Sequence, residues 1–536
     1  MISRREFLTG CAAVGAGCCL CHSIAAQAAV EDAAARTYHA SISIDALNED
    51  AELAGALKDA GVGHVWVASF FHGHWHHTVE DALAWKRRLE AMGMAVHQIT
   101  VPLGHPTFTE TQPDYMPGVP LMPWKGGVRP DGQRYHGVCL HPGATEANVE
   151  ALKQLKGAEP GIVFVDDDFR LAPSPNDIGG CFCEDHKRQF LARHGYGEPE
   201  WAALLEAVGK RELAPLVRAW VTDACDELTA SFRAQQEALR PEAELGIMVM
   251  FLGSEKAGIR LADYAGVPMR VGELMFDDAS FAPLKGKTDE LFSALFHRRF
   301  VAPERAFSET TAWPPDKLSA RNMAAKLAVS TLSDVRNTMF MSGNTPFPRT
   351  HWATLKPAMR KQAELHRQLA GHAPRGPFKH FWGEHSRWVG DANPYSLWLA
   401  AGVPFEVVEE PGADGWVFLA DADARAVTPD WRDKGATLIV RPDAGPQTAD
   451  LRAVEESLDA LFGLKHAVLP HLASVPYIEE DLPVVCAWYP TARAVLLWNL
   501  SEDRKELTLR CGETRRGVAV DGLDTALVTD VRLERS

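Results

Sequence analysis

Between residues 41 and 370 the sequence alternates short apolar segments with amphipathic stretches of helical periodicity. This alternation is the pattern of consecutive strand and helix units, and it strongly limits the folds available to the chain. The strand-like segments are 41–45, 64–69, 95–101, 161–166, 245–251, 269–276, 305–311 and 335–341. Eight such units over residues 37–374 predict an α/β fold of the (β/α)8 TIM barrel type with insertions.

The pattern changes beyond Pro374. A helical stretch at 393–401 and strand-like segments at 405–408, 416–419 and 436–440 predict a small α/β domain of flavodoxin or amidotransferase type over 376–470. From 480 to 536 only strand-like segments remain, which predicts a short antiparallel β domain. A chain of 536 residues exceeds what one hydrophobic core usually holds, so division into a barrel and two smaller domains is expected.

The first 28 residues have the form of an export signal. Ser3-Arg-Arg-Glu-Phe-Leu8 precedes an uncharged run that ends in Ala26-Gln-Ala28, which is typical of a twin-arginine signal with its cleavage site. The run is too short and too rich in Gly and Ala for a stable membrane span. We expect a periplasmic or secreted protein, with lipidation at Cys11 as a lesser alternative.

Charge narrows the range of partners. The formal net charge is −16 at pH 7, with 55 Lys and Arg against 71 Asp and Glu. Nucleic acids and anionic membranes bind proteins through clustered Lys and Arg side chains. With this negative net charge, neither is expected as a partner. A neutral or polar ligand fits this balance better.

The fourth strand-like segment ends in three acids. Gly161-Ile-Val-Phe-Val165 runs directly into Asp166, Asp167 and Asp168. An apolar run of this kind indicates a buried parallel strand, and barrel enzymes carry their chemistry at the carboxyl ends of such strands. Adjacent carboxylates repel one another, so holding three of them together costs free energy. Such a cluster therefore indicates a function such as proton transfer, metal binding or recognition of sugar hydroxyls. The alternative is a solvated acidic turn.

Further polar residues follow the other strand-like segments and are expected at the same barrel mouth. They are Asp45, His72, His74, His105, Glu273, Asp277, Asp278, Glu309, Trp313 and Asn344. Carboxylates on the fourth and seventh strands face each other across a barrel, as a glycosidase requires. Trp313 is predicted to stack on a sugar ring or, alternatively, to pack at the rim.

Four motifs resemble the family 42 glycoside hydrolases, microbial β-galactosidase-like enzymes. They are Val165-Asp-Asp-Asp168, Cys181-Phe-Cys183-Glu-Asp-His186, Phe190-Leu-Ala-Arg-His-Gly-Tyr196 and Gly132-Gln-Arg-Tyr-His-Gly-Val-Cys139. The resemblance implies a barrel, an α/β domain of the kind that the family uses for trimerisation, and a small β domain. It also implies a carbohydrate substrate and leaves open a homo-oligomer formed through the middle domain.

Roles follow from this resemblance residue by residue. Asp168 takes the place of the acid/base, where the family has Glu, and Asp167 that of a neighbouring Asn that contacts the sugar. Glu309 takes the place of the nucleophile. A retaining mechanism is expected, but Asp is shorter than Glu, so inversion stays open. Sugar contacts are also predicted for Asp45, Glu273, Trp313 and Asn344. The alternative for Glu309 is an ion pair with Arg305 or another cation.

Cys139, Cys181, Cys183 and His186 form a candidate structural zinc site. Three thiolates and one imidazole are common ligands of structural zinc, and the resemblance supports the assignment, although the family has a Cys at the position of His186. In an exported protein a disulfide from Cys139 is the alternative. No cofactor is expected for catalysis itself.

Two other functions remain open from the sequence. One is a metal-dependent barrel hydrolase with His72, His74, His105 and Asp278 as ligands. The other is a barrel that binds carbohydrate without cleaving it, since the acid/base Glu of the family is absent.

Overall fold

The computed structural model describes residues 36–103, 122–140, 143–166, 169–174, 176–249, 252, 254–272, 274–445, 448–472 and 475–532. The predicted signal at 1–28 therefore lies outside the described residues. Among the helices that are described, none is both long and apolar enough to cross a membrane.

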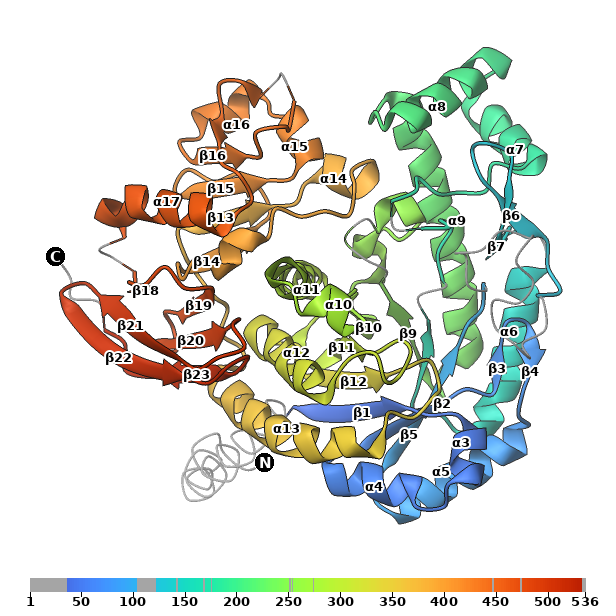
Figure 1. The fold of residues 1–536 in the computed structure, drawn as a ribbon. Helices are drawn as coiled ribbons and strands as arrows, with labels where there is room; N and C mark the ends of the chain where they lie inside the picture. The colour runs from blue at the N-terminus through green and yellow to red at the C-terminus, as the bar shows by residue number, and fades with distance from the viewer. Residues whose placement is uncertain are drawn as a thin grey trace, which may run out of the picture.

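Eight parallel strands close into a barrel (Figure 1). In chain order they are β1 (Thr37–Ser41), β2 (His64–Val67), β5 (Ala95–Thr100), β8 (Ile162–Val165), β9 (Glu244–Met248), β10 (Met269–Arg270), β11 (Ala306–Thr311) and β12 (Asn337–Met341). Each strand pairs with its neighbours in this sequence, and β1 closes the ring by pairing with β2 and β12. The predicted TIM barrel is confirmed.

Helices surround this barrel. They include α3 (Ile44–Glu49), α4 (Leu53–Ala60), α5 (Val79–Ala91), α6 (Ala144–Leu155), α7 (Glu184–His194), α8 (Glu198–Lys210), α9 (Pro215–Leu239), α10 (Asp278–Phe281), α11 (Leu284–His297), α12 (Ala320–Ser333) and α13 (Arg349–Leu369). The helical stretch after residue 198 is split because Arg211 takes a left-handed conformation with φ of 57°, and Pro215 starts the next helix. Val217, Val221 and Leu228 recur at helical spacing in α9 and are buried.

Two predicted elements are shorter than expected. The strand predicted over 269–276 ends at Arg270, because the N–H groups of Leu274 and Met275 donate to the Glu290 carboxylate and not to a strand. The helix predicted over 393–401 is only a 3-10 turn at Leu397–Ala400. In both places a carboxylate from another part of the chain accepts from backbone N–H groups, and such a contact is not visible in local sequence.

Two smaller units follow the barrel (Figure 1). The first has a parallel sheet in the order β14 (Phe405–Val408), β13 (Phe378–Phe381), β15 (Trp416–Leu419), β16 (Thr437–Val440), β17 (Arg452–Ala453), with helices α14 (Glu384–Trp388), α15 (Asp421–Arg425), α16 (Pro429–Asp433) and α17 (Leu458–Val468). The second has two antiparallel sheets, β18 (Tyr477–Ile478) with β21 (Lys505–Cys511) and β22 (Thr514–Val520), and β19 (Val484–Tyr489) with β20 (Ala494–Asn499) and β23 (Thr525–Val528). The α/β and antiparallel architectures are those predicted.

Three histidines stack at the amino end of the barrel. His39 of β1 and His64 of β2 are register partners with ring centroids 4.1 Å apart, and His97 of β5 stacks on Trp66 at 4.5 Å. Nδ1 of His64 and Nε2 of His97 are 3.1 Å apart. Above this histidine stack lies an apolar layer that includes Trp66 and Phe307. The stack is therefore separated from the carboxyl end of the barrel, where chemistry is expected.

Three close histidines suggest a metal site, but hydrogen bonds argue against it. Asn337 donates its amide N–H groups to backbone carbonyls, so its Oδ1 accepts from the Thr37 hydroxyl, which in turn accepts from Nε2 of His39. Nδ1 of His39 accepts from the indole of Trp66. Both nitrogens of His39 are thus engaged, and parallel rings do not converge on one ion.

The histidine stack should make the fold sensitive to acid. Burial, followed by the neighbouring His64, lowers the pKa of His97 from 6.5 to about 3. An unfolded chain takes up this proton below about pH 6.5 and the folded chain does not, so stability is complete above that pH and falls as pH decreases.

We expect His97→Phe, which keeps the stack on Trp66, to make this pH dependence shallower by about 1.4 kcal/mol per pH unit between pH 6 and 5. Urea unfolding at the two pH values measures the difference, with the exposed His471→Phe as the matched control. Equal slopes in His97→Phe and the wild type would contradict the expectation.

Candidate active site and metal centre

Two carboxylates and one guanidinium meet at the carboxyl end of the barrel. Glu309 lies on β11, Asp166 directly follows β8, and Arg270 is the last residue of β10. Nη2 of Arg270 is 2.6 Å from Oδ1 of Asp166 and 3.4 Å from Oε1 of Glu309. All three are buried, with exposed fractions of 1% for Arg270, 7% for Asp166 and 4% for Glu309. Carboxylates of strands four and seven thus meet around Arg270, whereas the predicted acid of strand four, Asp168, lies outside the described residues.

Sulfur-containing and aromatic side chains lie next to Arg270. Sulfur atoms of Met248 and Met339 lie 2.7 Å and 3.9 Å from its guanidinium nitrogens, and the aromatic layer of the barrel lies below. Charges in such an environment are costly unless each has a partner of opposite sign. The guanidinium and the two carboxylates therefore depend on one another.

This arrangement limits the roles open to each carboxylate. A guanidinium at hydrogen-bond distance favours the ionised form of a neighbouring carboxylate. Ionised Glu309 fits a nucleophile or a base, and Asp166 in direct contact with Arg270 is poorly suited to give up a proton as a general acid. A proton donor would have to come from another side chain at this end of the barrel.

Glu309 also forms an ion pair, which was the alternative considered for it from the sequence. Its cation is Arg270 of β10 and not Arg305, whose Nη2 instead lies 3.0 Å from Glu244. A contact with Arg270 does not exclude catalysis, because a nucleophile needs a group that keeps it ionised.

The other predicted contact residues are distributed around the barrel end. Asp167, Asp168, Glu273 and His105 lie outside the described residues. Oδ1 of Asn344 accepts from the hydroxyl of Ser41 at 2.9 Å, which fixes it where β1 and β12 end. Trp313 follows β11, and 52% of its surface is exposed, so it does not pack into the core. Exposure of a large aromatic side chain at this end of the barrel leaves its face available for stacking.

Asp45, His72, His74 and Asp278 lie in other elements of the described chain. Asp45 is exposed in the first turn of α3, and its carboxylate lies 3.6 Å from Nε2 of His77. His72 and His74 belong to the hairpin of β3 (Phe70–Phe71) and β4 (His74–Trp75) and its turn. Asp278 accepts from Ser319 and Asn322 at the start of α12. Within the described part of the chain, no group of potential metal ligands contains these residues.

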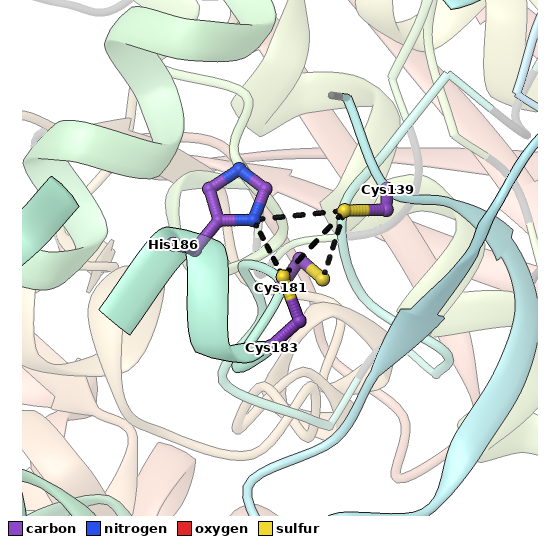
Figure 2. A group of neighbouring side chains, drawn as sticks. All are labelled: Cys139, Cys181, Cys183 and His186. Carbon is purple, nitrogen blue, oxygen red and sulfur yellow. Dashed lines mark hydrogen bonds between the residues drawn. The ribbon is translucent and has the colours of Figure 1, made fainter. Parts of the chain in front are cut away.

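Cys139, Cys181, Cys183 and His186 converge in one buried cluster (Figure 2). Cys139 follows β7 (Arg134–Val138), and His186 lies in the first turn of α7. The Sγ atom of Cys139 lies 3.3 Å from that of Cys181 and 3.8 Å from that of Cys183. Nδ1 of His186 is 3.3 Å from the sulfur of Cys183 and 3.6 Å from that of Cys139.

These distances fit the donor set of a tetrahedral zinc ion. With Zn–S bonds of about 2.3 Å and Zn–N bonds of about 2.0–2.1 Å, the edges of the tetrahedron measure about 3.5–3.8 Å. The observed distances between the sulfur atoms are too long for a disulfide, in which the sulfurs are about 2.05 Å apart. The described cysteines are all free. Nε2 of His186 lies 2.8 Å from the Glu227 carboxylate on α9, which would orient the imidazole toward an ion.

Comparison with known proteins identifies solved structures with a similar fold. No family model matches the sequence, and no curated protein matches it. Among solved structures, the chain is similar to a β-galactosidase from Rahnella sp. R3, with a TM-score of 0.54 and 13% identity over 92% of this chain and 98% of that chain. It also aligns with α-L-fucosidase isoenzyme 2 from Paenibacillus thiaminolyticus, with a TM-score of 0.47 and 11% identity over 74% of this chain and 62% of that chain. The first likeness covers nearly the whole chain, so the resemblance seen in the motifs holds at the level of the fold.

Arg270 and Glu227 were not predicted as site residues. Arg270 interrupts an apolar strand between Met269 and Val271, and a charge in such a position needs a buried partner, which was the available signal. Glu227 lies on the polar side of a long helix, where the sequence does not distinguish it from other surface acids.

Replacing Arg270 should strongly destabilise the barrel. Arg270→Met removes the cation that two buried carboxylates share, and we expect a loss of about 3–5 kcal/mol in the free energy of unfolding. Thermal and urea unfolding measure it. The matched control is Arg305→Met, because its pair with Glu244 is more exposed and should contribute only about 0–1 kcal/mol. Adding Glu309→Gln to Arg270→Met should recover part of the lost stability. Equal stability of Arg270→Met and Arg305→Met would contradict this account.

Proposed function

We propose that the protein is an exported glycoside hydrolase that cleaves an O-glycosidic bond with a pair of carboxylates. The observation that carries the proposal is buried Glu309 beside Arg270 at the carboxyl end of the barrel. It is supported by the fold shared with a β-galactosidase and by the family resemblance around Asp168.

Glu309 acts from one side of the sugar as the nucleophile, and Arg270 maintains its ionised form. Asp168 protonates the leaving oxygen, a role that the resemblance assigns to it and that its acidic neighbours favour by like-charge repulsion. Trp313 offers an aromatic face to the sugar, and Asn344 is fixed for contact with its hydroxyls. A retaining outcome is proposed by analogy with the family.

The cluster at Cys139 is proposed to hold a structural zinc ion. Its four ligands connect the β7 strand end to the start of α7, and a closed site of this kind stabilises the loop that follows β8 without entering the reaction. Export through the twin-arginine pathway would allow the metal to be bound before the folded protein leaves the cytoplasm.

Two substitutions test the carboxylate pair. Glu309→Gln and Asp168→Asn change little volume and should each lower turnover by orders of magnitude. With an activated aryl glycoside, whose leaving group scarcely needs protonation, Asp168→Asn should retain far more of the first step than Glu309→Gln. Steady-state and burst kinetics measure this, and Glu244→Gln, an acid at the opposite end of the barrel, is the control.

Full activity of both variants on a glycoside that the wild type cleaves would contradict the assignment. If the wild type binds but cleaves no glycoside, and Glu309→Gln binds equally well, the chain is a carbohydrate-binding barrel.

Metal analysis tests the zinc proposal. We expect one zinc ion per folded chain and its loss in Cys183→Ser, accompanied by lower thermal stability because one of four ligands is missing. Cys511→Ser, a buried cysteine of the C-terminal domain, should keep the metal. A wild-type protein that folds without zinc, or a Cys139 disulfide found by mass spectrometry, would refute the proposal.

A further inference from the structure

Two loops at the carboxyl end of the barrel are joined through their backbones. We name residues 169–174 and 176–180 the β8 loop and residues 254–258 the β9 loop. The N–H of Leu171 donates to the carbonyl of Ala257 at 2.8 Å, and the N–H of Gly179 donates to that of Lys256 at 2.7 Å. Ala172 packs on Ala257 in a small buried contact. The β8 loop directly follows the acidic residues after β8, so its position affects the candidate active site.

The β9 loop is in turn fixed by the α/β domain. We name residues 383–392, which contain α14, the strap. Nζ of Lys256 donates to the carbonyl of Gly390, and the carboxylate of Glu255 pairs with Arg387. Lys256 and Glu255 are only 1% and 2% exposed. Just before the strap, the indole of Trp382 donates to the carbonyl of Leu252 at 3.0 Å.

Arg211, in the turn between α8 and α9, connects the strap to the β8 loop directly. It donates to the carbonyls of Val389 at 2.8 Å and Gly390 at 2.7 Å in the strap, and to that of Asn176 at 2.7 Å in the β8 loop. Oδ1 of Asn176 accepts from the N–H of Ala392 at 2.9 Å. The Gly390 carbonyl thus accepts from two cationic side chains.

The packing around Gly390 leaves no room for a side chain. A Cβ atom at this position would lie 2.7 Å from Cα of Ser386 and 2.9 Å from Cβ of Ala422, so only glycine fits. Trp388 and Val389 pack in the same apolar cluster as Ile178 of the β8 loop. The strap is therefore held on one side by its own domain and on the other by the barrel.

Lys256 is sensitive to pH in this setting. Burial, reinforced by the nearby Arg211, lowers the pKa of Lys256 from 10.5 to about 7, while Asp391 of the strap and Asp177 of the β8 loop act in the opposite direction. A lysine whose pKa is lowered by burial takes up a proton near neutral pH when an opening of the structure exposes it to solvent. The contact between Lys256 and Gly390 should therefore open less often as pH rises through neutrality.

We propose that Lys256 is a positioning residue through which the α/β domain sets the place of the β8 loop and hence of the candidate active site. Lys256 acts through the Gly390 carbonyl on one side and the backbone of the β9 loop on the other. Only the catalytic consequence of this inference rests on the proposed function, because the coupling of strap and loop is a property of the fold.

Hydrogen exchange measured by mass spectrometry tests the coupling without any substrate. Lys256→Met keeps the length of the side chain and removes the donor, and we expect exchange in peptides over 169–180 to become about tenfold faster. Lys465→Met is the matched control, because Lys465 is also a buried lysine that donates to a carbonyl, that of Glu480, in another part of the molecule. It should leave exchange over 169–180 unchanged.

The pH dependence separates positioning from a simple loss of stability. In the wild type, exchange over 169–180, corrected for the intrinsic rate, should decrease between pH 6 and 8, and this decrease should be absent in Lys256→Met. If Lys256→Met does not fold, Asn176→Ala removes the exposed contact with Ala392 and should give a smaller increase in exchange.

Equal exchange of the β8 loop in the wild type and in the folded variants would overturn the proposal. On a glycoside that the wild type cleaves, Lys256→Met should lower kcat more than it changes KM, as expected for a misplaced acid. If the wild type cleaves no glycoside, the proposed function fails while the exchange result still decides the coupling.

Discussion

The ion pairs of Arg270 with Asp166 and Glu309 are the interaction on which the carboxyl end of the barrel depends. All three side chains are buried above an aromatic layer, where a charge without a counter-charge is costly. Their positions are therefore strongly coupled, and the coupling joins strands four, six and seven of the barrel. A site built in this way has little freedom to rearrange, and the proposed reaction, which needs two groups on opposite sides of one sugar ring, would depend on that rigidity.

The barrel interior is layered from one end to the other. Neutral histidines occupy the amino end, aromatic and sulfur-containing side chains the middle, and charged residues the carboxyl end. In this order the buried polar groups lie at the two ends, where each has a hydrogen-bond partner, and the centre of the barrel stays apolar. This order also separates the histidine stack, which responds to acid, from the charged residues at the carboxyl end, which would carry out the proposed chemistry.

The segment after β8 receives support from three directions. The cysteine and histidine cluster fixes its far end at Cys181 and Cys183, the β9 loop pairs with its backbone, and the strap of the α/β domain contacts it through Asn176. Loops that carry catalytic groups must be held by a rigid scaffold if the groups are to stay in place. In this protein the scaffold includes a second domain as well as the barrel.

The sequence by itself determined the barrel, the order of the later sheets and the four residues of the cysteine and histidine cluster, because these follow from local periodicity and from short motifs. It also placed Glu309 and the acids after β8 at the same end of the barrel, since all parallel strands present their carboxyl ends on one side. Only the tertiary structure decided which cation meets Glu309, how His39, His64 and His97 stack, and that Lys256 reaches Gly390. Each of these contacts joins residues distant in sequence through side chains whose partners depend on register and packing, and no local pattern contains that information.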